Sequence, residues 1–146
     1  MRIGIIDADL LGRTKHRFPN LACEKISGYW IEKGAETVLL RDYDHISDYD
    51  KVYISKVFTD TPVPQWILDD TLRPSSVHIG GIGFFFDQAP SLPIEIEHHM
   101  PDYRLYASLA SLMSLASISK MERKLVYPTS LGHFLIDYQI NEKNDI

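Results

Sequence analysis

"RIGIID", at residues 2–7, decides the fold of this 146-residue chain. Its isoleucines form a short apolar run that ends at an aspartate. A run of this kind is typical of a strand that is buried on both faces of a parallel sheet. The next residues, 8–19, include a glycine, a proline and several basic or histidine side chains, and we expect them to form a long loop.

Helix and strand patterns alternate beyond this loop. Residues 21–33 carry apolar side chains at helical spacing. Asn20 is placed to cap this helix, and Gly34 is placed to end it in the left-handed conformation. Further short strands are predicted within three stretches, which are residues 36–40, 51–58 and 75–79.

The order of these elements predicts an α/β protein. A second helix is expected to begin at Thr61, ahead of Pro62. Alternating strands and helices form a parallel sheet with helices on both faces, so we expect a Rossmann-like three-layer α/β/α domain with four to five mainly parallel strands. Residues 1–106 are assigned to this domain and its linker. Residues 107–146 are assigned to an irregular or helical extension, because the uncharged stretch 105–119 has the spacing of an amphipathic helix and a polar tail follows it.

The composition excludes several classes of protein. The net charge of −5 lacks the excess of lysine and arginine that non-specific nucleic-acid binding requires. The single cysteine, Cys23, cannot form an internal disulfide, a zinc ribbon or an iron–sulfur cluster. No run approaches the ~20 apolar residues of a membrane span, and no secretory signal opens the sequence. We therefore expect a cytoplasmic protein that binds neither nucleic acid nor membrane.

Three loops are expected at the candidate site, because ligands of such sheets bind beyond the carboxyl ends of the strands. The loop after the first strand carries Arg13, Lys15 and Arg17 ahead of a helix start, which fits either a phosphate or carboxylate site or a solvated basic loop. Ser55–Thr61 offers hydroxyl groups that either bind a ligand or cap the next helix. The third loop is "GGIGFFF", residues 80–86. Its glycines permit either a tight turn over core phenylalanines or the close approach of a flat ligand.

No catalytic or metal-binding motif is recognisable. The sequence contains no nucleophile elbow, no Ser/His/Asp set and no paired acid and base. His98 and His99 are adjacent, and neighbours on an extended chain point to opposite faces, so we do not expect them to share a metal ion. Cys23 lies among apolar residues of the predicted helix, where a buried and unreactive thiol is expected. We therefore assign no catalytic residue and no metal ligand.

Several stretches resemble a known family. "FPNLACEKISGYWIEKGAETVLL" (18–40) is similar to the opening of cobalamin-binding-like domains, which precede the catalytic barrel of many radical S-adenosylmethionine enzymes, including those of a bacterial subgroup. "VYISKVFTDT" (52–61) resembles the third-strand segment of that family, and "VHIGGIGFFF" (77–86) resembles its glycine-pair segment. "APSLPIEIEHHMPDYRLY" (89–106) looks like the linker that leads to the barrel. The resemblance covers about residues 2–106.

The resemblance implies an accessory domain that binds cobalamin and catalyses no reaction by itself. The residues that it places at the cofactor site are Asp9, Asn20, Ser55, Phe58, Thr59, Gly80, Gly81 and Gly83. It also implies the radical S-adenosylmethionine barrel of a parent protein as a partner.

Two motifs of the wider family are missing from this sequence. One is D-x-H-x-x-G, whose histidine binds cobalt. The other is C-x-x-x-C-x-x-C, whose thiolates hold an iron–sulfur cluster. The chain therefore resembles the domain without its catalytic half, as in a truncated or frameshifted product.

Two alternative functions stay open. The basic loop is consistent with a binding module for a nucleotide or another anionic small molecule. The uncharged stretch 105–119 is consistent with an interaction module that forms a homodimer through this helix.

Overall fold

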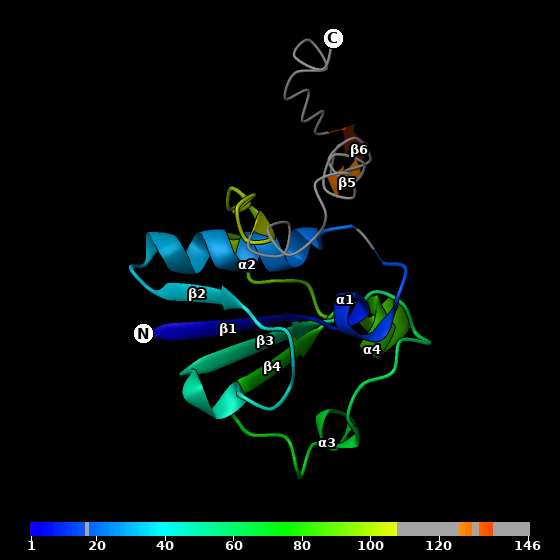
Figure 1. Cartoon of the computed structure of the whole chain (residues 1–146). Helices are drawn as coiled ribbons and strands as arrows, with labels where there is room; N and C mark the ends of the chain where they lie inside the picture. Colours follow the sequence, from blue (N-terminus) through cyan, green and yellow to red (C-terminus); the bar gives the residue numbers. More distant parts are fainter. Residues whose placement is uncertain (17, 108–125, 130–131, 136–146) are drawn as a thin grey trace, which may run out of the picture.

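Four parallel strands form the central sheet, in the order β2-β1-β3-β4. The computed structural model describes residues 1–16, 18–107, 126–129 and 132–135. The strands of the sheet are β1 (Arg2–Asp7), β2 (Glu36–Leu39), β3 (Lys51–Ser55) and β4 (Val77–Gly80). All neighbouring pairs are parallel, and in Figure 1 the four arrows point to the same edge of the sheet. The predicted α/β fold with a parallel sheet is confirmed.

Helices and turns cover both faces of this sheet. On one face lies α2 (Leu21–Glu32), with the short α5 (Ile94–Glu97) beside it, and on the other face lie η1 (Ile46–Asp48) and α3 (Gln65–Leu68) (Figure 1). The buried side chains of β1 alternate between the two sides. Ile3 and Ile5 belong to the core cluster under α2, whereas Ile6 belongs to the cluster on the opposite face. This alternation follows from the two-residue repeat of a strand and produces the expected three layers.

α2 begins and ends close to the predicted positions. Asn20 caps it, because its Oδ1 accepts hydrogen bonds from the N–H groups of Ala22 (2.9 Å) and Cys23 (3.3 Å). Beyond the end of the helix, Gly34 has a φ of 82°, which a residue with a side chain adopts only with strain. The predicted N-cap and the predicted left-handed glycine are both confirmed.

Short helices occupy the carboxyl edge of the sheet, where the sequence analysis expected only loops. α1 (Ala8–Gly12) follows β1 directly. Asp7 caps it by accepting a hydrogen bond from the N–H of Leu10 (3.2 Å). α4 (Ile82–Phe85) and η2 (Phe86–Gln88) follow β4.

The second predicted helix begins later than expected. α3 begins at Gln65, with Pro64 as the preceding residue, so the prediction of a helix start at Thr61 is wrong. The reason is that the Thr61 hydroxyl donates its hydrogen bond to Asp9 Oδ1 (2.6 Å) instead of capping a helix.

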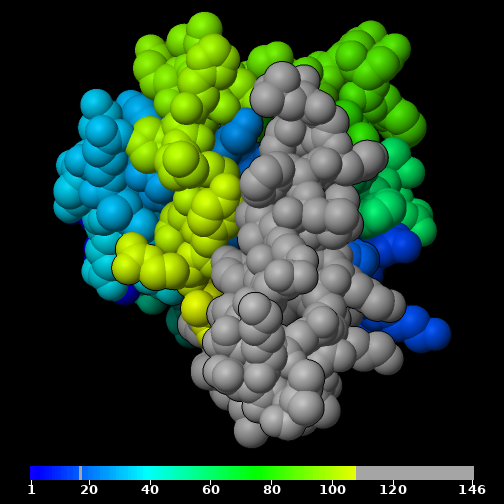
Figure 2. Space-filling model, turned by 90° about the horizontal axis from the view of Figure 1, so that it is seen from above, coloured from blue at the N-terminus to red at the C-terminus, as the bar shows by residue number. Residues whose placement is uncertain are grey.

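A segment that we call the strap, Pro90–Tyr106, runs along α2 and contains α5. In Figure 2 the yellow-green strap lies alongside the blue helix α2. Its last two residues, Leu105 and Tyr106, are buried in the core cluster under α2. These two residues open the stretch 105–119, for which a homodimer contact is one of the two alternative functions, and they are buried within the chain. Residues 108–119 lie outside the described part of the chain.

An antiparallel pair of strands lies within the stretch that was assigned to the C-terminal extension. It consists of β5 (Val126–Thr129) and β6 (Gly132–Leu135). The sequence pattern of this extension indicated a helix and a polar tail, and these strands were not predicted. Among the residues that the structure describes, no helix is long and apolar enough to cross a membrane.

Candidate functional site

Three strands end level with one another at the carboxyl edge of the sheet. Asp7 of β1 is in register with Ser55 of β3, and Ser55 is in register with Gly80 of β4. The loops after these strands therefore start at the same level, and they bring together side chains that are far apart in the sequence. The residues that the resemblance placed at a cofactor site all lie in this region, but they fall into separate groups.

Gly81 and Gly83 allow the chain to pack closely against the backbone of Lys56. Gly81 has a φ of 104°, and a Cβ built on it would lie 2.3 Å from the carbonyl oxygen of Lys56. A Cβ on Gly83 would lie 2.8 Å from the same oxygen, which accepts a hydrogen bond from the Gly83 N–H (2.8 Å). These two glycines therefore serve a contact within the protein.

Gly80 differs from its neighbour. Among the described residues, none has an atom within 4 Å of a Cβ built on Gly80. The bare backbone at this position faces open space, whereas the bare backbone at Gly81 faces Lys56.

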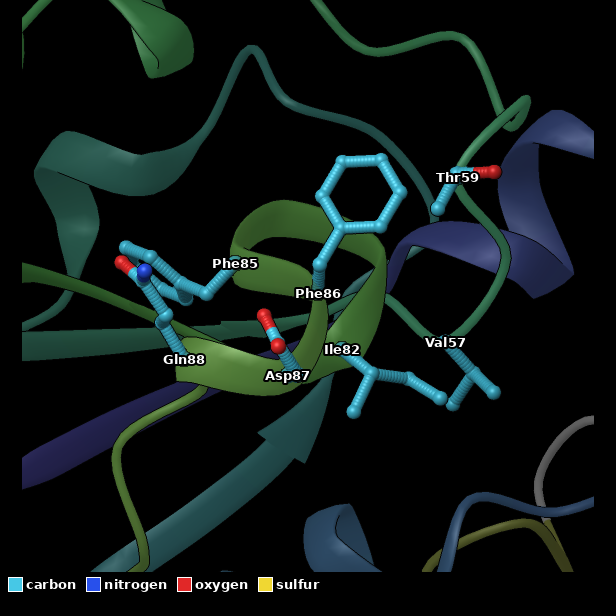
Figure 3. Close-up of a pocket in the computed structure, with 7 residues that line it drawn as sticks. All are labelled: Val57, Thr59, Ile82, Phe85, Phe86, Asp87 and Gln88. Atoms are coloured by element: carbon cyan, nitrogen blue, oxygen red, sulfur yellow. The ribbon is translucent and has the colours of Figure 1, made fainter.

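A shallow hollow of about 820 Å³ lies beside this corner. Apolar side chains line much of it, among them Val57, Ile82 and Phe86, which are 40%, 55% and 66% exposed. Phe86 has a φ of 54°, which is strained for an aromatic residue, and Figure 3 shows its ring projecting away from the ribbon. Phe84, in contrast, packs against the core. The phenylalanine run thus divides between the core and the surface.

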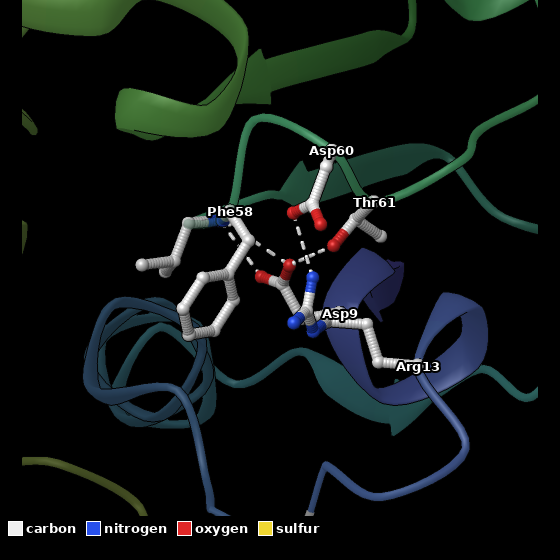
Figure 4. A network of polar contacts seen from close by, with 6 residues as sticks. Asp9, Arg13, Phe58, Asp60 and Thr61 are labelled. Carbon is white, nitrogen blue, oxygen red and sulfur yellow. Dashed lines mark hydrogen bonds and ion pairs between the residues drawn. The ribbon is translucent and has the colours of Figure 1, made fainter.

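Asp9 joins α1 to the loop after β3. Its side chain is 1% exposed, and its carboxylate accepts hydrogen bonds from the N–H groups of Val57 (2.7 Å) and Phe58 (3.2 Å) and from the Thr61 hydroxyl (2.6 Å). Figure 4 shows these donors converging on the carboxylate. Asp9 therefore fixes the shape of the loop, and its oxygens are engaged within the protein.

A second buried cluster links the ends of β1 and β3 to the strap. The Tyr106 hydroxyl donates to Asp7 Oδ2 (2.7 Å) and accepts from the backbone N–H of Asn20 (2.9 Å). The side-chain amide of Asn20 donates to Ser55 Oγ (2.8 Å). A continuous chain of hydrogen bonds thus runs from Asp7 through Tyr106 and Asn20 to Ser55.

Burial changes the acidity of the groups in this cluster. Desolvation raises the pKa of the Asp7 carboxyl above its usual value, against the lowering effect of the hydrogen bond from Tyr106. Burial also raises the pKa of the Tyr106 hydroxyl and of the Cys23 thiol. Cys23 is fully buried, and a raised pKa leaves it in the unreactive thiol form, as expected from its apolar neighbours.

We predict that Asp7→Asn changes the pH dependence of stability. The folded pKa of Asp7 is raised above 3.8, so the stability that this group contributes is fully present below that pH and is lost as the pH rises through the folded pKa. The asparagine variant does not ionise. Its free energy of unfolding relative to the wild type should therefore increase from about pH 4 to about pH 7, by ~1.4 kcal/mol for each unit by which the pKa is raised. Urea unfolding of both proteins across this range measures the difference, and a difference that does not vary with pH would contradict the assignment.

A cavity of about 510 Å³ lies between the sheet, α2 and the strap. Its walls include Ala22, Cys23 and Ile26 of α2, Tyr53, Ser55, His78, Gly80 and Gly81 at the sheet, and Leu92, Pro93, Ile96 and Glu97 of the strap. Most of these side chains are apolar, and Ser55 provides a hydroxyl at the level of the carboxyl edge. The size falls within the range of about 300–1,000 Å³ that is usual for small-molecule sites.

Two stacked rings lie at the wall of this cavity. The rings of Tyr53 and His78 are 5.1 Å apart at an interplanar angle of 26°. The Trp30 indole N–H donates to the Tyr53 hydroxyl (3.1 Å), which fixes the tyrosine. Desolvation and the nearby Lys51 lower the pKa of His78, so its imidazole is neutral at neutral pH.

The basic loop forms a hollow of its own, of about 540 Å³. Arg13 is bound within the protein, because its guanidinium contacts Asp60 Oδ1 (2.7 Å) and lies 4.4 Å from the centre of the Phe58 ring. Lys15 and His16 also line this hollow. Arg17 lies outside the described residues. Phe58 thus belongs to this hollow and Thr59 to the one beside Phe86, and neither lines the cavity under α2.

The adjacent histidines of the strap lie apart from the cavity. His99 contacts the Glu32 carboxylate and the ring of Tyr29, and His98 is exposed. Within the described part of the chain, no group of three or more histidine, cysteine or acidic side chains is placed to hold a metal ion.

Sequence reasoning missed the partners that complete the two buried clusters. Tyr106 was treated as part of a linker, and Thr61 as a helix cap, although both bind carboxylates of the first loop. The sequence did contain one indication of these contacts. Asp7 and Asp9 lie at the end of a buried apolar run, and buried carboxylates need hydrogen-bond donors. Which donors satisfy them depends on contacts between distant segments.

No family model, curated protein or solved structure matches this chain.

Proposed function

We propose that this chain is a non-catalytic binding domain. Its cavity under α2 holds a flat ring group of a cofactor. Cobalamin is the cofactor that the sequence resemblance implies, and it is the first ligand to test. The observation that carries the proposal is the 510 Å³ cavity under α2, which reaches the carboxyl edge of the sheet at Ser55 and Gly80. Parallel α/β sheets bind their ligands at this edge.

Ser55 is oriented to donate a hydrogen bond to a ligand. The Oδ1 of Asn20 is committed to the first turn of α2, so its side-chain amide must point its N–H toward Ser55 Oγ. Ser55 Oγ therefore accepts the hydrogen bond from Asn20, and the Ser55 hydroxyl proton is left to be donated to another group. Among the described residues, no acceptor for this proton is seen. A ring nitrogen or carbonyl oxygen on a ligand would supply one.

The apolar part of the walls favours a flat apolar group, and the one acidic lining residue, Glu97, is paired with Lys25. The apolar side chains of α2 and the strap offer dispersion contacts, and the neutral His78 stacked on Tyr53 adds an aromatic surface without adding charge. Gly80 leaves room for the ligand to approach the backbone. Because the sequence lacks the D-x-H-x-x-G motif, we expect the protein to hold the ligand through this flat ring group rather than through a bond between a histidine and cobalt.

The test compares cobalamin binding to the wild type with binding to Gly80→Leu. We expect the wild type to retain bound hydroxocobalamin through gel filtration. The leucine side chain would enter the cavity and should weaken binding by about 10- to 100-fold, as over-filling a packed site does. Gly80→Ala is the matched control, because no other atom of the described residues lies within 4 Å of its methyl group, and it should preserve both the fold and most of the binding.

Two outcomes would refute the proposal. One is a wild-type protein that elutes free of cobalamin, and the other is a Gly80→Leu variant that binds as well as the wild type. A thermal midpoint that rises with a nucleotide, and not with cobalamin, would instead favour the alternative site at Lys15 and His16, which forms a separate hollow.

A further inference from the structure

The strap provides one wall of the cavity, but its backbone is only loosely joined to the domain. Among the described residues, a single backbone hydrogen bond connects the two, from the N–H of Asp102 to the carbonyl oxygen of Glu24 (2.9 Å). The other backbone hydrogen bonds of the strap lie within it or join it to the next residue, Ala107. Segments with few backbone hydrogen bonds to their surroundings open at low free-energy cost.

Side chains therefore hold the strap in place. In its cavity-lining half, Ile96 is buried, and Glu97 forms an ion pair with Lys25 of α2 (2.8 Å). The Glu97 side chain is 45% exposed, and an ion pair at the surface contributes little stability. This half of the strap thus rests mainly on apolar packing.

The other half is held by buried polar contacts. Ser27 of α2 donates to Asp102 Oδ2 (2.8 Å), and the Tyr106 hydroxyl bonds to both Asp7 and Asn20. Leu105 and Tyr106 are buried. The strongest attachment of the strap therefore lies at its end, beyond the cavity that it covers.

The same attachment reaches the polar end of the cavity. Tyr106 accepts from the backbone N–H of Asn20, and the side chain of Asn20 donates to Ser55, which lines the cavity. A ligand bonded to Ser55 and a docked Tyr106 would both hold Asn20 in one position. Ligand binding should therefore favour the docking of Tyr106, and the docking of Tyr106 should favour ligand binding, because both hold Asn20 in the same position.

We infer that the strap is a wall that opens locally to admit the ligand, that Tyr106 is the residue that holds it closed, and that ligand binding and strap docking stabilise each other. The last part rests on the proposed binding function, whereas the first two concern the protein without a ligand.

Amide hydrogen exchange on the full chain tests the inference, with Tyr106→Phe as the main variant. Removing the hydroxyl leaves Asp7 and the Asn20 N–H without this partner, so exchange in peptides from the strap should accelerate by about tenfold or more, whereas peptides from β1 and β3 should change little. Tyr49→Phe is the matched control. It removes a phenol hydroxyl from a residue packed on the opposite face of the sheet, and it should leave the strap unchanged.

Gly28→Ala provides a second variant that does not touch Asp7, Asn20 or Tyr106. Alanine favours the helix over glycine, but its Cβ would lie 2.2 Å from the carbonyl oxygen of Met100, so the strap must shift. We expect faster exchange in the strap without faster exchange in the strands. Equal exchange in the strap of both variants and the wild type, or acceleration spread evenly over the sheet, would overturn the inference.

Hydroxocobalamin is the probe for the coupling. Added to the wild type, it should slow exchange in the strap, and its dissociation constant should rise by about tenfold or more in Tyr106→Phe, although Tyr106 does not line the cavity. If cobalamin does not bind, the proposed function and the coupling fail together, while the exchange of the unliganded variants still decides whether Tyr106 holds the strap. If cobalamin binds and leaves strap exchange unchanged, the coupling alone is refuted.

Discussion

Gly81→Ala is expected to destabilise the domain by about 3 kcal/mol, because two costs add at this position. A residue with a side chain is strained at a φ of 104°, at a cost of about 1–3 kcal/mol. The new Cβ would also lie 2.3 Å from the Lys56 carbonyl oxygen, and relieving such a contact by moving the backbone costs about 1–3 kcal/mol more. Urea unfolding of the wild type and the variant measures the loss.

The neighbouring glycine gives the control for this prediction. Gly80→Ala adds the same methyl group to the preceding residue, where it meets open space, and it should change the free energy of unfolding by no more than about 0.5 kcal/mol. If the two variants proved equally stable, the close packing of Gly81 on Lys56 would be wrong. The contrast also separates the glycine that serves the fold from the glycine that faces the proposed ligand.

Asp9→Ala should cost about 3–5 kcal/mol, which is a large share of the ~5–15 kcal/mol that stabilises a typical domain. The substitution leaves the partly buried N–H groups of Val57 and Phe58 and the buried hydroxyl of Thr61 without their shared acceptor. Each buried donor that loses its partner costs about 1–3 kcal/mol. Chemical denaturation gives the total, and faster amide exchange at residues 57–61 would localise the damage.

Asp60→Ala is the matched control for Asp9. This neighbouring carboxylate is paired with Arg13, but its side chain is 75% exposed, and surface ion pairs contribute about 0–1 kcal/mol. A small effect at Asp9, comparable with that at Asp60, would show that the loop after β3 does not depend on the buried carboxylate. That result would reopen Asp9 as a ligand-binding residue.

The main elements of the fold could be predicted from local sequence, since each rests on contacts within a short stretch or on a simple period. The apolar run of β1 requires burial on both faces. Asn20 begins α2 through hydrogen bonds to its side-chain oxygen, and Gly34 ends it by adopting the left-handed conformation. Thr61 shows where this reasoning fails. A threonine before a proline is a good helix start only when its hydroxyl is not needed elsewhere, and here Asp9 binds it.

The candidate site was predictable in position but not in the roles of its residues. The carboxyl edge follows from the parallel sheet, so the loops that hold Asn20, Ser55 and Gly80 could be located in advance. The cavity itself could not, because its third wall is the strap, whose path depends on the packing of Gly28 under Met100.

By itself, the sequence determined the α/β class, the burial of β1 and the edge of the sheet at which a ligand would lie, because alternating strands and helices admit few arrangements. Only the tertiary structure decided that Gly80 faces open space and Gly81 packs on Lys56, since nothing in the sequence distinguishes two adjacent glycines. It also decided that Tyr106 would meet Asp7, a hydroxyl and a carboxylate 99 residues apart. Such a pairing is specified by the path of the whole chain, and no local pattern contains it.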